Sequence, residues 1–356
     1  MENLLIDKPK DVRTEDQLDL DLLKSYLEKE FSIVIHSISL EQFSGGASNL
    51  TYQITFNEKA YILRCPPKGT KAKGAHDMSR ESKIISVLAP YYPYVPKVEL
   101  YCSDTAVIGR EFYIMEKISG IIPRANLPRG LELSPEKVRD LCLRVIDKLV
   151  DLHKINIENT ELQSFGKGKG YANRQIMGWV ERYRKAKTWN VPSCQYVIHW
   201  LQTNIPSEEY TCFIHNDFRF DNVVLSANEH LEVIGILDWE MATVGDGLMD
   251  LGNSLAYWIQ ADDDFVFKMF RRQPTHLKGM LTRKEVIQYY CERMRLKNID
   301  FTFYEVYGLF RLLVIIQQIY FRYHHKQTSN PAFKNFWFMV NYLNWRCKRI
   351  IKKKKG

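Results

Sequence analysis

One stretch, residues 211–252, constrains this chain of 356 residues more than any other. It reads TCFIHNDFRFDNVVLSANEHLEVIGILDWEMATVGDGLMDLG. Apolar runs at 212–214, 223–225 and 231–237 alternate with polar segments, which is typical of short strands joined by turns. The sequence therefore predicts a hairpin with Asp217 and Asn222 ahead of it and Asp238 directly after it.

The spacing of these three polar residues suits phosphoryl transfer. That reaction needs a carboxylate to accept or orient a hydroxyl proton, and oxygen ligands for Mg²⁺ beside the nucleotide phosphates. The pattern H-x-D-x-x-x-x-N, followed by a strand and another Asp, is typical of kinases. We assign Asp217 as the catalytic base and Asn222 and Asp238 as metal ligands. The alternative is two Asx-capped turns on an ordinary hairpin, which the complete set of residues disfavours.

The same stretch resembles the aminoglycoside phosphotransferase-like, or choline-kinase-like, small-molecule kinases. Within them it is most similar to the branch that includes the kinase domain fused to some acyl-CoA dehydrogenases. The family usually has Gly where this chain has Asn216, although Asn tolerates left-handed backbone better than most residues. The segments that carry the resemblance are HNDFRFDN at 215–222, LDWE at 237–240 and GDGLMDL at 245–251.

The resemblance extends over most of the chain and implies an α+β, two-lobed protein-kinase-like fold. A small antiparallel-sheet N-lobe, residues 1–116, would bind the nucleotide. A mainly helical C-lobe, residues 117–356, would carry the catalytic loop and the acceptor site. The implied activity is ATP-dependent phosphorylation of a small-molecule hydroxyl, with Mg²⁺.

A glycine-containing turn supplies the first candidates for nucleotide binding. Gly45 and Gly46 allow a tight turn, and Ser48 and Asn49 follow them. Exposed N–H groups in such a turn can cradle phosphates, and the family carries a similar turn over the nucleotide. The alternative is an ordinary hairpin turn.

Three further residues complete the expected nucleotide site. Arg64 ends a strand at the position where many kinases carry a phosphate-contacting Lys, and a guanidinium can grip phosphate or carboxylate with two donors. Glu81, on a helix predicted over 76–89, is its candidate partner. A surface strand residue and a solvated helix face are the respective alternatives. Glu116 follows predicted strands at 97–102 and 111–115, where the family places its interlobe hinge and receives the adenine.

Periodic apolar residues predict helices outside these motifs. Thr14 and Gln17 form a capping box for a helix over 14–31. Asp250 is expected to open another helix and to brace the catalytic loop, and His153 is expected to be structural. Further helices are predicted over residues 134–153, 283–296, 302–325 and 331–350.

Charge and hydropathy limit the kinds of partner that the chain is expected to bind. The net charge of +8 comes from 50 basic against 42 acidic residues, but six of the basic residues lie within the last nine positions. We interpret this tail as a solvated helix end; binding to anionic lipid or nucleic acid is the alternative. Nothing else resembles a nucleic-acid-binding module. The most apolar long stretch, 309–321, is too short and too polar to cross a bilayer, so we expect no stable membrane insertion.

Cysteine usage indicates the compartment. The chain has seven cysteines and no C-x-x-C pair, and an odd number of this kind is typical of reduced thiols in a cytoplasmic protein. The N-terminal residues contain no apolar segment of the kind found in signal peptides.

The acceptor is constrained only by composition. Residues 256–350 contain 7 Asp and Glu against 16 Lys and Arg, together with many aromatic residues. This balance favours a neutral or anionic acceptor with an apolar portion, such as a hydroxyacyl compound. An aminoglycoside or choline kinase is the alternative, with residues 262–264 attracting a cation. A pseudokinase that only binds a nucleotide or metabolite is an alternative of another class. The sequence leaves the oligomeric state and the choice between ATP and GTP open.

Overall fold

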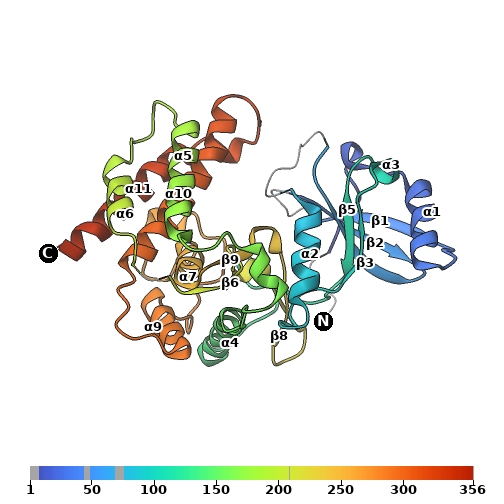
Figure 1. Cartoon of the computed structure of the whole chain (residues 1–356), viewed down its shortest axis with the longest axis horizontal. Helices are drawn as coiled ribbons and strands as arrows, with labels where there is room; N and C mark the ends of the chain where they lie inside the picture. Colours follow the sequence, from blue (N-terminus) through green and yellow to red (C-terminus); the bar gives the residue numbers. More distant parts are fainter. Residues whose placement is uncertain (1–7, 44–48, 69–75, 208, 356) are drawn as a thin grey trace. The chain divides into compact units, whose positions relative to one another are not determined.

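The computed structural model describes residues 8–43, 49–68, 76–207 and 209–355 (Figure 1). The chain divides into two compact units. Unit 1 comprises residues 1–123, 127–132 and 221–242. Unit 2 comprises residues 124–126, 133–220 and 243–356. The predicted α+β fold, with a small antiparallel sheet followed by a mainly helical part, is confirmed.

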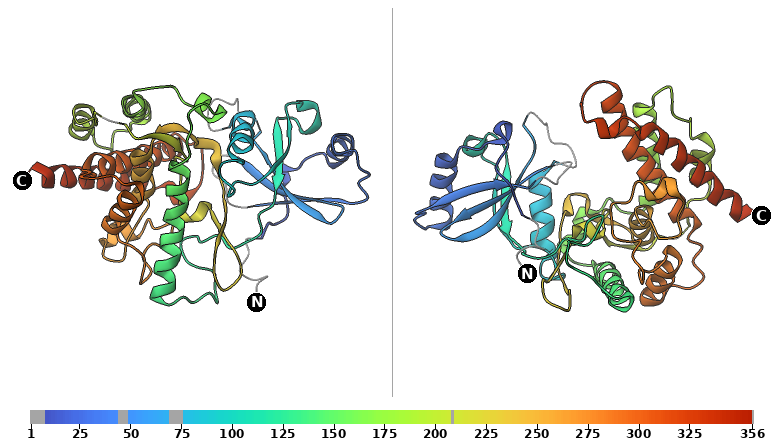
Figure 2. Two further views of the ribbon diagram at one scale, coloured as in Figure 1. Left: turned by 60° about the horizontal axis from the view of Figure 1, so that its bottom comes forward. Right: turned by 180° about the vertical axis from the view of Figure 1, so that it is seen from behind.

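Unit 1 is built on one five-stranded antiparallel sheet with the strand order β1-β2-β3-β5-β4. Helices α1 and α2 lie on opposite sides of it (Figures 1 and 2). The elements are β1 (Ile38–Gln42), β2 (Leu50–Phe56), β3 (Lys59–Cys65), β4 (Val98–Cys102), β5 (Phe112–Glu116), α1 (Leu20–Phe31), α2 (Met78–Leu88) and the short α3 (Thr105–Ile108).

The alternating direction of side chains along β3 determines which of its residues face the core beneath α1. Leu63 and Cys65 join Leu23 and Leu27 of α1 in one buried apolar cluster. Successive side chains of a strand point to opposite faces, so Arg64 points away from this cluster, towards the side of the sheet that carries α2. The same alternation that builds the core thus presents a charged residue to the opposite face.

The start of α1 differs from the prediction. Thr14 and Gln17 do not cap it; residues 14–16 form a separate 3₁₀ turn and Gln17 is extended. The helix begins at Leu20, because the Asp19 carboxylate accepts hydrogen bonds from the N–H groups of Asp21 and Leu22. Such N-cap bonds satisfy donors that the first helical turn leaves unpaired.

A hairpin of β7 (Val223–Leu225) and β8 (Val233–Ile236) also belongs to unit 1. It joins the rest of the unit through a backbone bridge between Ile121 and Leu225. A Cβ on Gly120 would lie 2.3 Å from the Leu225 carbonyl oxygen, so this approach requires glycine. The hairpin predicted from the sequence is therefore present and is anchored to the segment that follows β5.

Unit 2 is mainly helical, with a two-stranded antiparallel sheet of β6 (Thr211–Ile214) and β9 (Thr243–Asp246). The long helix α10 packs against α5, α7 and α11 (Figure 1). The helices are α4 (Pro135–His153), α5 (Tyr171–Ala186), α6 (Gln195–Thr203), α7 (Gly247–Ala256), α8 (Phe265–Lys268), α9 (Arg283–Met294), α10 (Thr302–His324) and α11 (Phe336–Lys355).

Helices α7 and α10 touch through their backbones. A Cβ on Gly252 would lie 2.5 Å from the carbonyl oxygen of Tyr304, and one on Gly308 would lie 2.1 Å from that of Gly252. Neither distance is possible for a real side chain, so both positions require glycine. Among the described residues, none of the helices combines the length and apolarity that a membrane span requires.

The start of α7 also corrects a prediction. Asp250 does not open this helix; α7 begins at Gly247 and is capped by Asp246, whose carboxylate accepts from the Met249 N–H at 2.8 Å. Asp250 lies in the first turn instead and is fully buried. The side chain of Asp250 is therefore available for partners outside its own helix.

Candidate active site

In unit 1, Arg64 joins α2 to the segment after β8. Its Nη1 donates to Glu81 Oε1 at 2.5 Å, and its Nη2 donates to Asp238 Oδ1 at 3.2 Å. Glu240 Oε2 lies 3.9 Å from the same Nη2. The predicted pairing of Arg64 with Glu81 is confirmed, and the guanidinium bridges two residues that are 157 positions apart, 81 and 238.

Burial and charge act in opposite directions on this pair. Burial raises the pKa of Glu81 to about 7, against the lowering effect of the Arg64 guanidinium. Burial also disfavours the charge on Arg64, but the carboxylate of Glu81, with Tyr113 and Asp238, outweighs it and holds the pKa of Arg64 well above its usual value. Arg64 therefore keeps its positive charge inside unit 1.

Asn222 and Asp238 lie at the same end of the β7–β8 hairpin. The Leu237 N–H donates to the Asn222 carbonyl oxygen at 2.8 Å, continuing the ladder in which Val223 pairs with Ile236. Asp238 then adopts a left-handed backbone with φ 68°. The hairpin thus brings the two predicted metal ligands to neighbouring positions of two adjacent chain segments.

Glu240 is a site residue that the sequence interpretation missed. The Asn49 Nδ2 donates to its Oε2 at 2.8 Å, and Asn49 Oδ1 lies 2.9 Å from His76 Nδ1. Asn49 therefore contacts the same carboxylate that approaches Arg64. The position of Glu240, two residues after Asp238, is the sequence feature that could have indicated a place in this site. Gly45, Gly46 and Ser48 lie outside the described residues.

Glu116 closes β5 through two contacts with Lys97. The Glu116 N–H donates to the Lys97 carbonyl oxygen at 2.8 Å, and its Oε1 accepts from the Lys97 N–H at 2.8 Å. Both contacts fix the end of the strand, at the place where the sequence predicts an interlobe hinge.

In unit 2, a buried carboxylate holds the turn before Asp217. Asp250 accepts hydrogen bonds from the backbone N–H groups of His215 and Asn216, both at 2.8 Å. Its Oδ2 also lies 3.1 Å from His153 Nε2. Burial by itself would raise the pKa of Asp250, but its contacts with His153 and His215 lower it overall. Asp250 therefore braces this turn as an ionised carboxylate.

Asn216 supplies the left-handed residue of the turn, with φ 66°. Its Oδ1 accepts from the hydroxyl of Tyr171 at 3.1 Å and from Asn253 Nδ2 at 3.2 Å. Its carbonyl oxygen accepts from Arg311 Nη2 at 2.8 Å. Asn thus takes the conformation that favours glycine and adds side-chain contacts that glycine cannot make.

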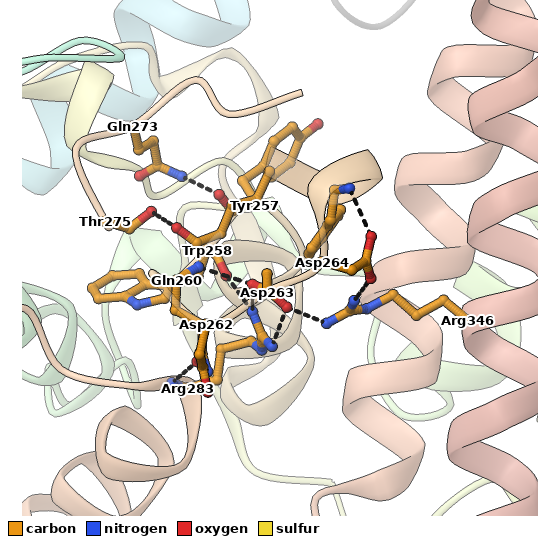
Figure 3. A network of polar contacts seen from close by, with 12 residues as sticks. Tyr257, Trp258, Gln260, Asp262, Asp263, Asp264, Gln273, Thr275, Arg283 and Arg346 are labelled. Atoms are coloured by element: carbon orange, nitrogen blue, oxygen red, sulfur yellow. Dashed lines mark hydrogen bonds and ion pairs between the residues drawn. The ribbon is translucent and has the colours of Figure 1, made fainter. Parts of the chain in front are cut away.

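Asp217 follows this turn and pairs with an arginine that the sequence interpretation did not single out. Arg219 Nη2 lies 3.1 Å from Asp217 Oδ2, and the guanidinium lies 4.7 Å from the centre of the Tyr257 ring. Gln273 connects the same region, because it accepts from the Phe220 N–H and donates to the Tyr257 carbonyl oxygen (Figure 3). The candidate base is therefore held beside a positive charge.

The three consecutive aspartates at 262–264 are also engaged in polar contacts of unit 2 (Figure 3). Asp263 is buried and pairs with Arg283 at 2.6 Å and with Arg346 at 2.8 Å. Asp264 lies 3.5 Å from Arg346 and accepts from the hydroxyl of Tyr342 at 2.5 Å. Two of the three carboxylates are thus neutralised by arginines within unit 2.

A model of one protein family matches residues 39–285 of the chain, and its description is "Phosphotransferase enzyme family". This chain belongs to that family. Mouse acyl-CoA dehydrogenase family member 10 is 34% identical to it over 326 residues, which cover 90% of this chain and 30% of the relative. Human acyl-CoA dehydrogenase family member 11 is 33% identical over 322 residues, which cover 88% and 40%. The chain thus spans 30% to 40% of the length of these two relatives.

Solved structures of the family and its neighbours share the fold. A putative aminoglycoside phosphotransferase from Ralstonia eutropha aligns with a TM-score of 0.78 and 25% identity, covering 95% of this chain and 99% of that structure. A choline kinase from Cryptosporidium parvum aligns with a TM-score of 0.63 and 14% identity, covering 95% and 97%. An ADP-bound aminoglycoside phosphotransferase aligns with a TM-score of 0.54 and 18% identity, covering 92% and 98%.

The predicted resemblance is therefore confirmed. Membership of the phosphotransferase enzyme family implies a nucleotide as phosphoryl donor and a small molecule as acceptor.

Proposed function

We propose that this protein transfers the γ-phosphoryl group of ATP to a hydroxyl group of a small molecule. The observation that carries the proposal is the bridge that Arg64 makes between Glu81 and Asp238. It fixes one positive charge and one carboxylate side by side, as a donor site for Mg²⁺-nucleotide requires. Asn49 and Glu116, with the glycine turn at Gly45, Gly46 and Ser48, complete the proposed nucleotide site.

Asp217 is the proposed base that accepts the hydroxyl proton of the acceptor. Its backbone position is supported by the hydrogen bonds from His215 and Asn216 to Asp250. Positioning and charge stabilisation supply most of the catalysis in phosphoryl transfer. The ion pair with Arg219 supports the assignment, because it keeps the carboxylate of Asp217 oriented.

Asn222 and Asp238 are the proposed ligands of Mg²⁺. Their side-chain oxygens are the hard donors that this ion prefers, and Mg²⁺ is commonly held by one or two protein oxygens together with substrate phosphates. The described residues contain no group of three His, Cys, Asp or Glu side chains suited to a metal, so the proposal relies on the Asn222 amide and on the nucleotide. When bound, Mg²⁺ neutralises charge on the phosphates.

For the acceptor, we propose a neutral or anionic compound. Arg219 places a guanidinium 3.1 Å from the candidate base, and a cationic acceptor would be repelled there. Asp263 and Asp264, which could otherwise attract a cation, are paired with Arg283 and Arg346. A hydroxyacyl compound suits this balance, and the names of the relatives, acyl-CoA dehydrogenase family members 10 and 11, favour acyl chemistry.

The proposed compartment is the cytoplasm. All seven cysteines are free thiols, and six of them are buried. Reduced thiols are typical of proteins in a reducing compartment.

The roles can be tested by two substitutions measured together. Asp217→Asn should lower turnover by at least about a hundredfold while leaving nucleotide affinity nearly unchanged, because the base acts on the acceptor. Asp238→Ala should weaken Mg²⁺-nucleotide binding by about tenfold or more, since a charged ligand is lost. Calorimetry with a non-hydrolysable nucleotide separates the two effects, and Asp262→Asn is the matched control. The opposite pattern would reverse the assignment.

The acceptor class can be tested by competition. ADP release is measured with hydroxyacyl compounds, glycerol-like alcohols, choline and kanamycin at equal concentration and ionic strength. We expect turnover with hydroxyacyl or neutral compounds. Turnover with choline or kanamycin alone would favour a cation kinase, and nucleotide binding with no turnover of any acceptor would favour a pseudokinase.

A further inference from the structure

Helix α11 presents two chemically different faces. One face is buried: Met339, Leu343 and Cys347 each have at most 1% of their surface exposed, and this helix packs on α10. On another face Phe338 and Trp345 are 42% and 49% exposed. Tyr342 lies between them, at the four- and three-residue spacing that places side chains on one side of a helix.

The short helix α8 extends this exposed surface. Its first residue, Phe265, is 76% exposed, and Met269, directly after it, is 55% exposed. α8 is tied to α11 because the Tyr342 hydroxyl donates to Asp264 at 2.5 Å and the Tyr342 ring lies 6.0 Å from that of Phe267. We name the set Phe265, Met269, Phe338, Tyr342 and Trp345 the aromatic face.

Strong positive charge accompanies the aromatic face. The α11 sequence, FWFMVNYLNWRCKRIIKKKK, contains seven Lys and Arg and no Asp or Glu. Arg346 is engaged with Asp263, and Lys354 with Asp300. Arg349, Lys352 and Lys353 are exposed, and the Arg349 guanidinium lies 5.5 Å from the Trp345 ring. The exposed aromatic and basic side chains therefore lie along one side of α11, at the spacing that runs from Phe338 through Trp345 to Lys352.

We propose that the aromatic face and the adjacent basic residues Arg349, Lys352 and Lys353 bind the surface of an anionic lipid bilayer. Exposed aromatic residues in this number mark an interaction surface rather than ordinary solvent exposure. Trp and Tyr settle at the depth of lipid headgroups, with the apolar ring towards the acyl chains and the polar group towards water. Lys and Arg beside them are attracted by anionic headgroups.

A bilayer fits the geometry of this surface. A broad, flat partner can reach this surface, because Phe338, Trp345, Arg349 and Lys352 are all exposed along one side of α11. Charge complementarity selects an anionic surface, because Arg349, Lys352 and Lys353 are exposed and α11 itself contains no Asp or Glu. The helix lies on such a surface without crossing it, which agrees with the absence of a membrane-spanning helix among the described residues.

The test is co-sedimentation of the full chain with vesicles of phosphatidylcholine alone or mixed with phosphatidylserine. We expect binding to the anionic vesicles, weak binding to the neutral ones, and loss of binding as salt rises. The double substitution Lys352→Glu and Lys353→Glu should weaken binding by about tenfold or more. Phe338→Ser with Trp345→Ser should weaken it by a similar factor. The tryptophan fluorescence of the unaltered chain should shift to the blue on binding, and Trp345→Phe should reduce that shift.

Matched controls come from unit 1 and from α4. Lys29→Glu with Lys137→Glu changes the net charge equally at exposed positions elsewhere, and Leu22→Ser removes an apolar side chain that is 53% exposed. Both controls should bind like the unaltered chain. Equal binding to neutral and anionic vesicles, or equal losses in controls and test variants, would overturn the proposal. Absence of vesicle binding would also overturn it. A dimer that the Phe338 and Trp345 substitutions dissociate would then assign the surface to a second copy of the chain.

Discussion

Glu81 in unit 1 and Asp250 in unit 2 are both buried carboxylates, with 1% and 0% of their surface exposed. Burial raises the pKa of Glu81 to about 7 even though it touches Arg64. The pKa of Asp250 is lowered, because His153 and the backbone N–H groups of His215 and Asn216 donate to it. The number and placement of donors therefore decide the charge of a buried carboxylate, and burial alone does not.

The difference suggests different uses for the two residues. Asp250 is fully satisfied and holds a turn in one conformation. Glu81 makes its close bond with Arg64, which is shared with Asp238, and contacts with Tyr113 and the Trp239 backbone lower its pKa less than burial raises it. We interpret the first arrangement as structural support and the second as one that can exchange partners when a nucleotide binds.

The largest effect is expected when the buried carboxylate of Asp250 in unit 2 is replaced by an amide. Asp250→Asn should lower the free energy of unfolding by about 3 kcal/mol, because the amide cannot accept all the bonds that the carboxylate accepts. Denaturant unfolding measures this, with Asp262→Asn as the control for an exposed aspartate. Wild-type stability in Asp250→Asn would show that the turn before Asp217 does not depend on this brace.

The second prediction concerns the pH dependence of Glu81. Its folded pKa of about 7 lies above the unfolded value, so its contribution to stability is complete below about pH 4.5 and is lost as pH rises to about 7. Glu81→Gln should remove that decline, which is on the order of 1–3 kcal/mol. Asp250 should behave oppositely, its contribution being lost at low pH. Parallel pH profiles for Glu81→Gln and the unaltered protein would contradict the comparison.

The third prediction extends the comparison to Asp217, whose arginine partner belongs to the proposed acceptor site. Arg219→Gln should raise the KM of an anionic acceptor about five- to tenfold, because one charge-assisted contact is lost. The KM of ATP and of a neutral acceptor should change little. Steady-state kinetics with Arg322→Gln as control tests this. Equal changes for anionic and neutral acceptors would mean that Arg219 only supports the loop.

The smallest effect is expected for an exposed carboxylate. Asp300 pairs with Lys354 at 2.5 Å and is 53% exposed. Burial opposes its charge, but Lys354 and Thr302 lower its pKa to about 2. Its contribution is therefore present above about pH 4 and is lost as pH falls towards 2. Asp300→Asn should cost less than about 1 kcal/mol at neutral pH, and thermal unfolding at low and high salt measures it.

Local sequence patterns were sufficient to predict part of this architecture. The β7–β8 hairpin, the pairing of Arg64 with Glu81 and the left-handed backbone at Asn216 all follow from residue types within short segments or from the stated resemblance. A hairpin needs only alternation and a turn, and a buried strand arginine needs a carboxylate on the helix packed against it.

Other features depend on contacts that no local pattern records. The pairing of β6 with β9 joins strands about 30 residues apart, and Asp263 meets Arg346 from α11. Asp250 was expected to open its helix, but the helix begins three residues earlier, where the Asp246 carboxylate caps it. Arg219 was not predicted as a site residue, because its position depends on the contact with Tyr257, and only folding brings the two residues together.

The glycine contact between α7 and α10 has a mechanical consequence. Because Gly252 and Gly308 let the two backbones touch, there is no layer of side chains between them that could change rotamer and absorb a displacement. α7 carries Asp250, which holds His215 and Asn216, and α10 carries Arg311, which holds the Asn216 carbonyl oxygen. A displacement of α10 should therefore also displace the residues before Asp217, because no side-chain layer between the two helices can absorb it.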